Sequence, residues 1–235
     1  MGGMSVIGSG GFNITNIITY SAYAFYNFNA WGSLRVLPEG SFDIEKTTDF
    51  GIYAFNEFNA NGSLEELAEG SFRFGTGLEE LGRWAFIGFN REGELLELPD
   101  GSFNTYHIHT YGVNAFDSFN RGGKLQKLPL GSFEFTQAQT INIDFLAWFN
   151  AEGGQLSTLP ISSFNMDAIN NPVGFDAATY TFMRHFNDGG GLVKRLDGTQ
   201  IKNITAYPTT AFYYAAPDEQ VNSGQNMTYW ADGQV

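Results

Sequence analysis

A unit of about thirty residues recurs along most of this chain, and no other feature of the sequence constrains the fold as strongly. The clearest marker of the unit is Gly-Ser-Phe, which degenerates to Gly-Gly-Phe in the first copy and Ser-Ser-Phe in the last. Its phenylalanine recurs at steps of 30, 30, 31, 30 and 31 residues, at Phe12, Phe42, Phe72, Phe103, Phe133 and Phe164. Such a period is typical of proteins whose repeats stack on one another, so we predict a repeat solenoid.

Three further markers keep the same period. Leu-x-x-Leu begins at Leu34, Leu64, Leu95, Leu125 and Leu156, and all but the second copy continue with Pro. Ala-Phe places its ring at Phe25, Phe55, Phe86 and Phe116. Phe-Asn begins at Phe28, Phe58, Phe89, Phe119, Phe149 and, after a longer gap, Phe186. One unit therefore has the pattern L-x-x-L-P-x-G-S-F, a variable stretch, and then G-x-x-A-F-x-x-F-N-x-x-G.

Each unit contains patterns typical of both strand and helix. Leu-x-x-Leu is short and is followed at once by Pro and Gly, which favours a short strand that ends in a turn. The β-branched stretch 12–19 also predicts a strand. Ile52, Phe55 and Phe58 are three residues apart, which predicts one or two turns of helix that end before Gly62. We therefore expect a leucine-rich-repeat-like solenoid of mixed short β-strands and short helices.

The recurring phenylalanines are predicted to form the core. One unit cannot bury its own apolar face, so equivalent rings should stack in three ladders: Phe12 to Phe164, Phe25 to Phe116, and Phe28 to Phe186. The asparagine after the last ring should satisfy backbone groups at a turn rather than bind a ligand. The predicted organisation is a lead-in at 1–11, regular repeats at 12–164, divergent last repeats at 165–212, and a C-terminal cap or linker at 213–235.

Composition and charge exclude several partners. The 235 residues carry a net charge of −13, so the chain would repel nucleic acid and anionic membrane surfaces. No apolar run approaches the length of about 18 residues that a membrane span needs, so we expect no membrane insertion. The first residues show neither the basic nor the apolar region of a secretion signal. The absence of cysteine excludes disulfides and thiolate metal sites.

No arrangement of residues predicts catalysis, a metal or another cofactor. His107 and His109 share one repeat and would point the same way on a strand, but other repeats carry unrelated residues at these positions. The carboxylate pairs Glu65-Glu66 and Glu79-Glu80 stand at variable positions without a partner motif, which favours a solvated acidic face over glycoside hydrolysis. We therefore predict that the chain is not an enzyme.

Two rows of variable positions are the candidate binding residues. The first lies between the leucines of Leu-x-x-Leu and changes charge along the chain; it includes Arg35, Glu65, Glu66, Glu97, Gln126 and Lys127. The second lies just before Ala-Phe and consists of Tyr23, Tyr53 and Trp84. Exposed aromatic rings can anchor a protein or a sugar. The alternative for the second row is a ladder of half-buried rings without a binding role.

The assembled unit resembles the BspA-like leucine-rich repeat family of bacterial surface proteins, which share the Leu-x-x-Leu element followed by Pro and an Ala-Phe in a short helical segment. The resemblance covers roughly residues 10–212, although these units are longer and Phe-Asn stands where a cysteine is common. It implies an extracellular or cell-surface, adhesin-like module that binds a protein or glycan on another cell or in the same assembly. The alternative is a structural or virion component, or a filament, that self-associates through solenoid–solenoid contacts.

Overall fold

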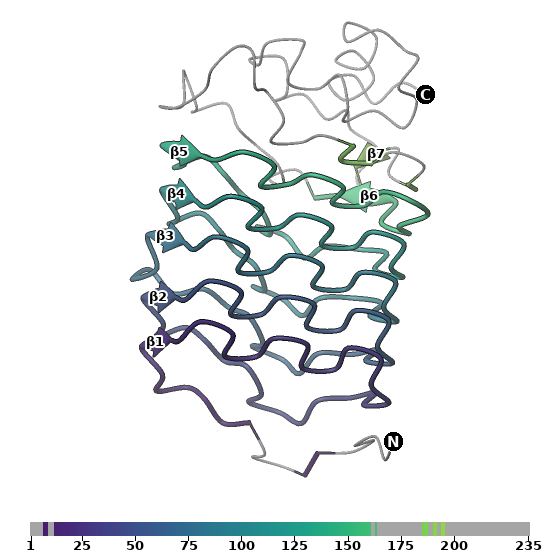
Figure 1. The fold of residues 1–235 in the computed structure, drawn as a ribbon, viewed down its shortest axis with the longest axis horizontal. Helices are drawn as coiled ribbons and strands as arrows, with labels where there is room; N and C mark the ends of the chain where they lie inside the picture. Colours follow the sequence, from purple (N-terminus) through teal and green to yellow (C-terminus); the bar gives the residue numbers. More distant parts are fainter. Residues whose placement is uncertain are drawn as a thin grey trace, which may run out of the picture.

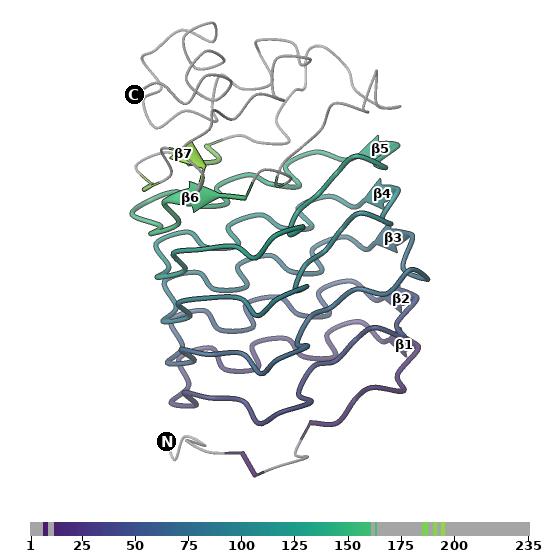
Figure 2. The same ribbon diagram turned by 180° about the vertical axis from the view of Figure 1, so that it is seen from behind.

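The computed structural model describes residues 7–8, 12–160, 163, 185–187, 190–191 and 194–195. Within these residues the chain winds into coils that lie one above another (Figures 1 and 2). The strands are β1 (Thr19–Tyr20), β2 (Asp49–Phe50), β3 (Glu80–Leu81), β4 (Thr110–Tyr111), β5 (Thr140–Ile141), β6 (Thr158–Leu159) and β7 (Lys194–Arg195). Strands β1 to β5 mark the same corner of successive coils (Figure 1). The described chain is therefore a repeat structure, compatible with a repeat solenoid.

The strands pair in parallel from coil to coil, in three short sheets: β1-β2, β3-β4-β5 and β6-β7. Thr19 lies opposite Asp49 and Tyr20 opposite Phe50, so the register equals the sequence period. In β1 to β3 the first residue is exposed and the second is buried. This alternation follows from the two-residue period of a strand, and it places one side chain of each strand in the core.

Each coil has three sides. The turn side follows the strand and comprises 21–32, 51–62, 82–93, 112–123 and 142–154. The leucine side carries Leu-x-x-Leu and comprises 33–39, 63–69, 94–100, 124–130 and 155–160. The strand side runs from the Gly-Ser-Phe corner to the next strand, over 42–50, 72–81, 103–111 and 133–141. Buried apolar side chains from all three sides form one core.

The turn side was predicted to be helical, and this prediction is wrong because the described residues contain no helix. The amide groups of Phe55 and Asn59 donate to the carbonyl oxygens of Ala85 and Phe89 in the next coil, both at 2.8 Å. A helix would instead direct them to carbonyls four residues earlier. Every second amide instead closes a turn within its own coil. The Ala54 amide, for example, donates to the carbonyl oxygen of Gly51. Buried rings spaced by three or four residues fit this run of turns as well as they fit a helix.

Left-handed residues recur along the turn side and are incompatible with a right-handed helix. Tyr53, Glu57 and Asn61 have φ angles of 60°, 50° and 52°.

Gly62 does not end a helix, as the sequence predicted, but lies where two coils approach each other closely. A Cβ at Gly62 would overlap the carbonyl oxygen of Asn29 and the side-chain oxygen of Asn59, so only glycine allows the two coils to approach here.

Backbone bonds between described turn-side segments all have one direction. The amides of Phe25, Phe55, Phe86 and Phe116 each donate to the following coil. On the leucine side the bonds of Ser63, Glu65 and Glu94 run the other way, from the later coil to the carbonyl groups of the earlier one. Each coil thus directs turn-side amides toward the C-terminal end of the stack, and leucine-side amides toward the N-terminal end.

The three phenylalanine ladders are confirmed wherever their members are described. In the first ladder ring centroids lie 5.4–5.5 Å apart from Phe12 to Phe133, and Phe164 lies outside the described residues. Steps from Phe25 to Phe116 are 5.2–5.7 Å. Steps from Phe28 through Phe149 to Phe186 are 4.8–5.3 Å. Neighbouring ladders meet edge to face, as between Phe72 and Phe89 at 90°, which is a favoured aromatic geometry.

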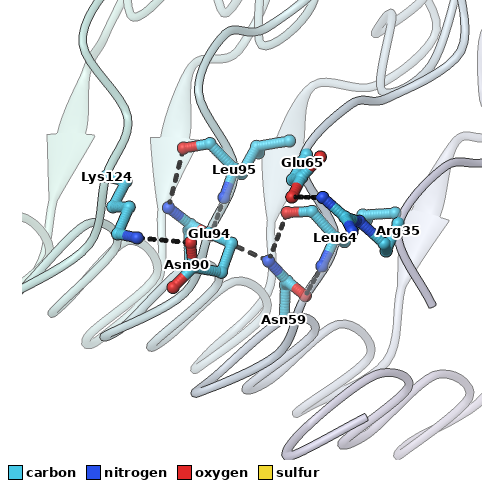
Figure 3. A network of polar contacts seen from close by, with 8 residues as sticks. All are labelled: Arg35, Asn59, Leu64, Glu65, Asn90, Glu94, Leu95 and Lys124. Atoms are coloured by element: carbon cyan, nitrogen blue, oxygen red, sulfur yellow. Dashed lines mark hydrogen bonds and ion pairs between the residues drawn. The ribbon is translucent and has the colours of Figure 1, made fainter. Parts of the chain in front are cut away.

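A ladder of buried asparagines joins the turn side to the leucine side (Figure 3). The side-chain amide of Asn59 donates to Asn90 Oδ1 at 3.0 Å and to the carbonyl oxygen of Leu64 at 3.1 Å. Its Oδ1 accepts from the Leu64 amide at 3.2 Å and from the Asn29 side chain at 2.8 Å. The pattern continues through Asn120 and Asn150 to Asn187. These asparagines satisfy backbone groups within the core, as the sequence predicted.

The predicted strands are shorter in the structure. In the stretch 12–19, Asn13 makes an antiparallel bridge to Ser41, and only its last residue belongs to a strand, β1 (Thr19–Tyr20). The Leu-x-x-Leu segments form parallel bridges, Val36 to Glu66 and Glu97 to Lys127, and contribute β6. The predicted regions at 1–11, 165–212 and 213–235 lie largely outside the described residues.

Candidate binding surfaces

The aromatic row predicted before Ala-Phe lies on the turn side. Tyr23 and Tyr53 stack with ring centroids 5.1 Å apart, and Tyr53 and Trp84 stack at 4.8 Å. All three residues have positive φ, at 62°, 60° and 57°. Tyr23 is 53% exposed, whereas Tyr53 and Trp84 are half-buried. The row is therefore both a stacked ladder and a partly exposed surface.

Neighbouring side chains enlarge this row into a patch, which we name the aromatic patch and which comprises Tyr23, Tyr26, Ile52, Tyr53 and Trp84. Tyr26 packs edge to face against Tyr23 and Tyr53, at 5.6 and 6.4 Å. Trp31, eight residues after Tyr23 on the turn side of the same coil, is 67% exposed. The guanidinium carbon of Arg83 lies 4.4 Å from the Trp84 ring centroid, a cation–π distance. Sequence reasoning missed Tyr26, Trp31, Ile52 and Arg83, because these side chains would have had other orientations in the predicted helix.

The charged row between the leucines lies on the leucine side (Figure 3). Arg35 pairs with Glu65 of the next coil, and Lys127 lies 3.6 Å from Glu97 of the preceding coil. Lys124 and Glu94, which flank the row, pair at 2.5 Å. Exposed pairs of this kind add little stability, about 0–1 kcal/mol each. Opposite charges therefore meet along this row.

An open groove of about 410 Å³ lies on the leucine side, between two successive coils. Three predicted residues line it, Glu65, Glu66 and Glu97, together with Leu96 and Pro99. Gln126 lies on the same side and is exposed. The structure thus brings the charged candidates together on one surface and the aromatic candidates together on another.

A second cluster on the turn side involves the last described coils. Arg121 donates to both carboxylate oxygens of Glu152, at 2.8 and 2.5 Å, and these hydrogen bonds lower the pKa of Glu152. The Arg121 guanidinium carbon also lies 4.7 Å from the Trp148 ring centroid. Trp148 in turn stacks on His185 at 4.0 Å. No signal in the sequence indicated this cluster, because its members belong to three different coils.

The candidate metal residues do not come together with other ligands. His107 is exposed in a turn, and His109 immediately precedes β4. In the part of the chain that the structure describes, no group of three His, Asp or Glu residues could hold a metal ion. Among the described residues, the most buried titratable group is Tyr111, whose pKa is raised by burial, and whose hydroxyl donates to the carbonyl oxygen of Thr105 at 3.1 Å. This bond belongs to the core.

None of the described segments is a helix long and apolar enough to cross a membrane. Comparison with known proteins finds no matching family model and no matching curated protein.

Proposed function

We propose that this chain is a non-enzymatic binding module of the leucine-rich-repeat type, and that it docks a protein partner on the aromatic patch of its turn side. The observation that carries the proposal is the exposure of Tyr23 and Tyr26, which pack against each other on the first described coil. Large aromatic side chains that remain in water are typical anchors of protein interfaces. The recurring residues are buried and build the core, so recognition falls to the variable exposed positions.

The contrast with the leucine side supports the choice of surface. There the charges of Arg35, Glu65, Glu97 and Lys127 meet partners within the chain. A partner that used these charges would have to replace existing ion pairs, which reduces the gain. The aromatic patch has apolar surface that a partner can still remove from water, at about 25 cal/mol for each Å² buried.

Ring geometry favours a protein over a glycan at this patch. A sugar ring packs best on the open face of an aromatic ring. Tyr53 is stacked between Tyr23 and Trp84 at 5.1 and 4.8 Å, so both of its faces are occupied. Its edge and hydroxyl group remain for contact, and these suit the mixed apolar and hydrogen-bonding surface of a protein. The adhesin-like role and the cell-surface location belong to this proposal and follow from the resemblance.

Binding by a variant with Tyr23→Asn, Tyr53→Asn and Trp84→Asn tests the proposal. Asparagine already occupies the equivalent position as Asn114, with φ of 54°, so the backbone should tolerate it. Wild type and variant are applied to arrays of immobilised extracellular proteins and of glycans. We expect wild-type binding to a protein that the variant loses, while the exposed Leu130→Asn control retains it. Equal binding by the variant, or loss confined to glycans, would contradict the proposal.

Assembly through solenoid–solenoid contacts is the second candidate, and one observation favours it. The carbonyl groups of Ala24, Tyr26 and Phe28 occupy the positions that accept turn-side bonds in later coils, yet no described amide donates to them. An open edge of acceptors can receive the amides of another coil. We expect light scattering of the purified chain to show association that rises with concentration if this contact forms. A strict monomer would exclude it.

A further inference from the structure

We propose that a hollow on the strand side, around Lys46, Arg73 and His107, binds an acidic monosaccharide unit. The hollow has a volume of about 660 Å³, within the range of small-ligand sites. Its lining contains none of the aromatic patch residues. The site is thus separate from the protein-docking surface and independent of that proposal.

One coil contributes the small residues Gly75, Thr76 and Gly77 to the lining of the hollow. Gly75 occupies the position that holds Glu45 in the preceding coil and Tyr106 in the following coil. A Cβ at Gly75 would overlap the carbonyl oxygen of Glu45, so the position requires glycine. At Gly77 an added Cβ would come within 3.1 Å of one methyl group only, that of Thr48. The loop is also longer by one residue, because Glu80 follows Phe72 by eight positions whereas Asp49 follows Phe42 by seven.

Three successive coils bring basic side chains, Lys46, Arg73 and His107, to this hollow. Lys46 and His107 occupy equivalent positions two coils apart, with Thr76 between them. Lys46 donates to Asn16 Oδ1 at 2.8 Å, and no carboxylate among the described residues pairs with it. By contrast, Lys124 and Lys127 each pair with a glutamate of the preceding coil. Acidic residues outnumber basic ones in this chain, whose net charge is −13, so a lysine without a carboxylate partner is unusual in it.

Arg73 retains hydrogen-bonding capacity toward the hollow. Its ion pair with Glu69 measures 3.6 Å, and its bond to the Asp100 carbonyl oxygen measures 3.4 Å. Both distances are long for charge-assisted bonds, which are normally about 2.7–2.9 Å. One carboxylate, that of Glu45, also lines the hollow and offsets part of the positive charge. The lining nevertheless includes one carboxylate against a lysine, an arginine and a histidine.

Donor groups and dimensions together define the ligand class. The Asn104 side chain accepts from the Tyr106 amide at 3.1 Å through its oxygen, which leaves its amide group to donate. Together with Lys46, Arg73 and the Thr76 hydroxyl, it surrounds the hollow with donors, so the ligand should be rich in acceptors. The volume exceeds that of a bare oxyanion. A sugar that carries one carboxylate matches both requirements, with its charge between Lys46 and Arg73 and its hydroxyls toward Thr76 and Asn104.

Titration calorimetry of the full chain with glucuronate tests this site, with glucose and inorganic sulfate as matched probes. Glucuronate should bind at least about tenfold more tightly than either, because a charged hydrogen bond and neutral ones act together. Lys46→Gln and Arg73→Gln should each weaken glucuronate binding by about tenfold, whereas Lys124→Gln should leave it unchanged. Thermal unfolding of each variant verifies that it is folded.

Three results would overturn the inference. The first is absence of glucuronate binding, or binding no tighter than that of glucose. The second is sulfate binding as tight as glucuronate binding, which would leave the sugar without a role. The third is unchanged affinity in the folded Lys46→Gln and Arg73→Gln variants.

Discussion

The turn side and the leucine side of each coil are built from the same chain, yet they stack by different rules. On the turn side, left-handed residues recur and amides donate to the following coil. On the leucine side no residue with positive φ occurs within 63–69 or 94–100, and the bonds of Ser63 and Glu94 lead to the preceding coil. An ordinary sheet has little net dipole because its bond directions alternate. In this protein the hydrogen bonds between coils lead one way on the turn side and the opposite way on the leucine side.

The two sides derive their stability from different groups. The turn side ends in the asparagine ladder, whose members are fully buried in the interior coils and bond to two neighbours. The leucine side contributes buried leucines and exposed ion pairs, and the latter add little. Disruption of the turn side should therefore cost more than disruption of exposed leucine-side positions.

The largest expected effect is that of Asn90→Leu. The change removes the partners of both backbone groups of Leu95 and breaks the links to Asn59 and Asn120. Each buried polar group left unpaired costs about 1–3 kcal/mol, so the free energy of unfolding should fall by about 4–6 kcal/mol. Urea denaturation measures this value. Ser102→Ala, which removes one buried bond to the Ser71 carbonyl oxygen, should cost only about 1 kcal/mol. Equal losses for the two variants would show that the asparagine ladder contributes no more than one buried hydrogen bond.

Phe89→Ala should follow closely, with a loss of about 3–5 kcal/mol in the free energy of unfolding. Phe89 is fully buried and stacks on Phe58 and Phe119, at 5.0 and 4.9 Å. The matched change Leu96→Ala removes an exposed side chain from the leucine side and should cost less than about 0.5 kcal/mol. A small loss for Phe89→Ala would show that the ladder is not the core.

Glycine substitutions should have opposite signs on the two sides. Glu92 has φ of 54°, and its equivalent in the next coil is Gly122. Glu92→Gly should relieve left-handed strain and raise the free energy of unfolding by about 0.5–1 kcal/mol. Gln126→Gly on the leucine side should lower it by about as much. Thermal and urea unfolding of both variants measure the signs, and a loss in both would mean that the two sides do not differ in backbone strain.

The smallest expected effect is that of the double change Glu65→Ala and Glu66→Ala. Both side chains line the open leucine-side groove, and only Glu65 has an ion pair, with Arg35. Stability should change by less than about 0.5 kcal/mol, because exposed side chains and exposed ion pairs contribute little. A loss of several kcal/mol in urea denaturation would place these residues in the interior and refute the assigned register.

Much of the core was predictable from the sequence, whereas the backbone of the turn side was not. The ladders through Phe42, Phe55 and Phe58 follow from period alone, because equivalent residues of stacked coils must meet. The role of Asn59 followed from the same argument. The helix at 51–58 was a wrong prediction, since a period of three to four does not distinguish a helix from turns whose alternate amides bond to another coil. Only the structure shows Tyr53, Glu57 and Asn61 in left-handed conformation.

The candidate surfaces were predictable in part. Period identified the outward positions, and the structure places Arg35, Glu65, Glu66, Glu97, Gln126 and Lys127 on one side. The sequence period could not identify Trp31 or Tyr26 as exposed, because the orientation of these side chains depends on the turns. The hollow at Lys46 is lined by residues of three successive coils, and it becomes visible only when these coils are placed in register.

The central claim is that the turn side consists of turns, and not helices, whose hydrogen bonds with the equivalent turns of other coils all lead to the following coil. NMR couplings across hydrogen bonds, between amide nitrogen and carbonyl carbon in isotope-labelled protein, test this claim. The structure predicts a coupling from the Phe55 amide nitrogen to the carbonyl carbon of Ala85, because their hydrogen bond measures 2.8 Å. The same experiment should link Asn59 to Phe89. Couplings from Phe55 to the carbonyl carbon of Gly51, four residues earlier in the same coil, would show a helix and contradict the account.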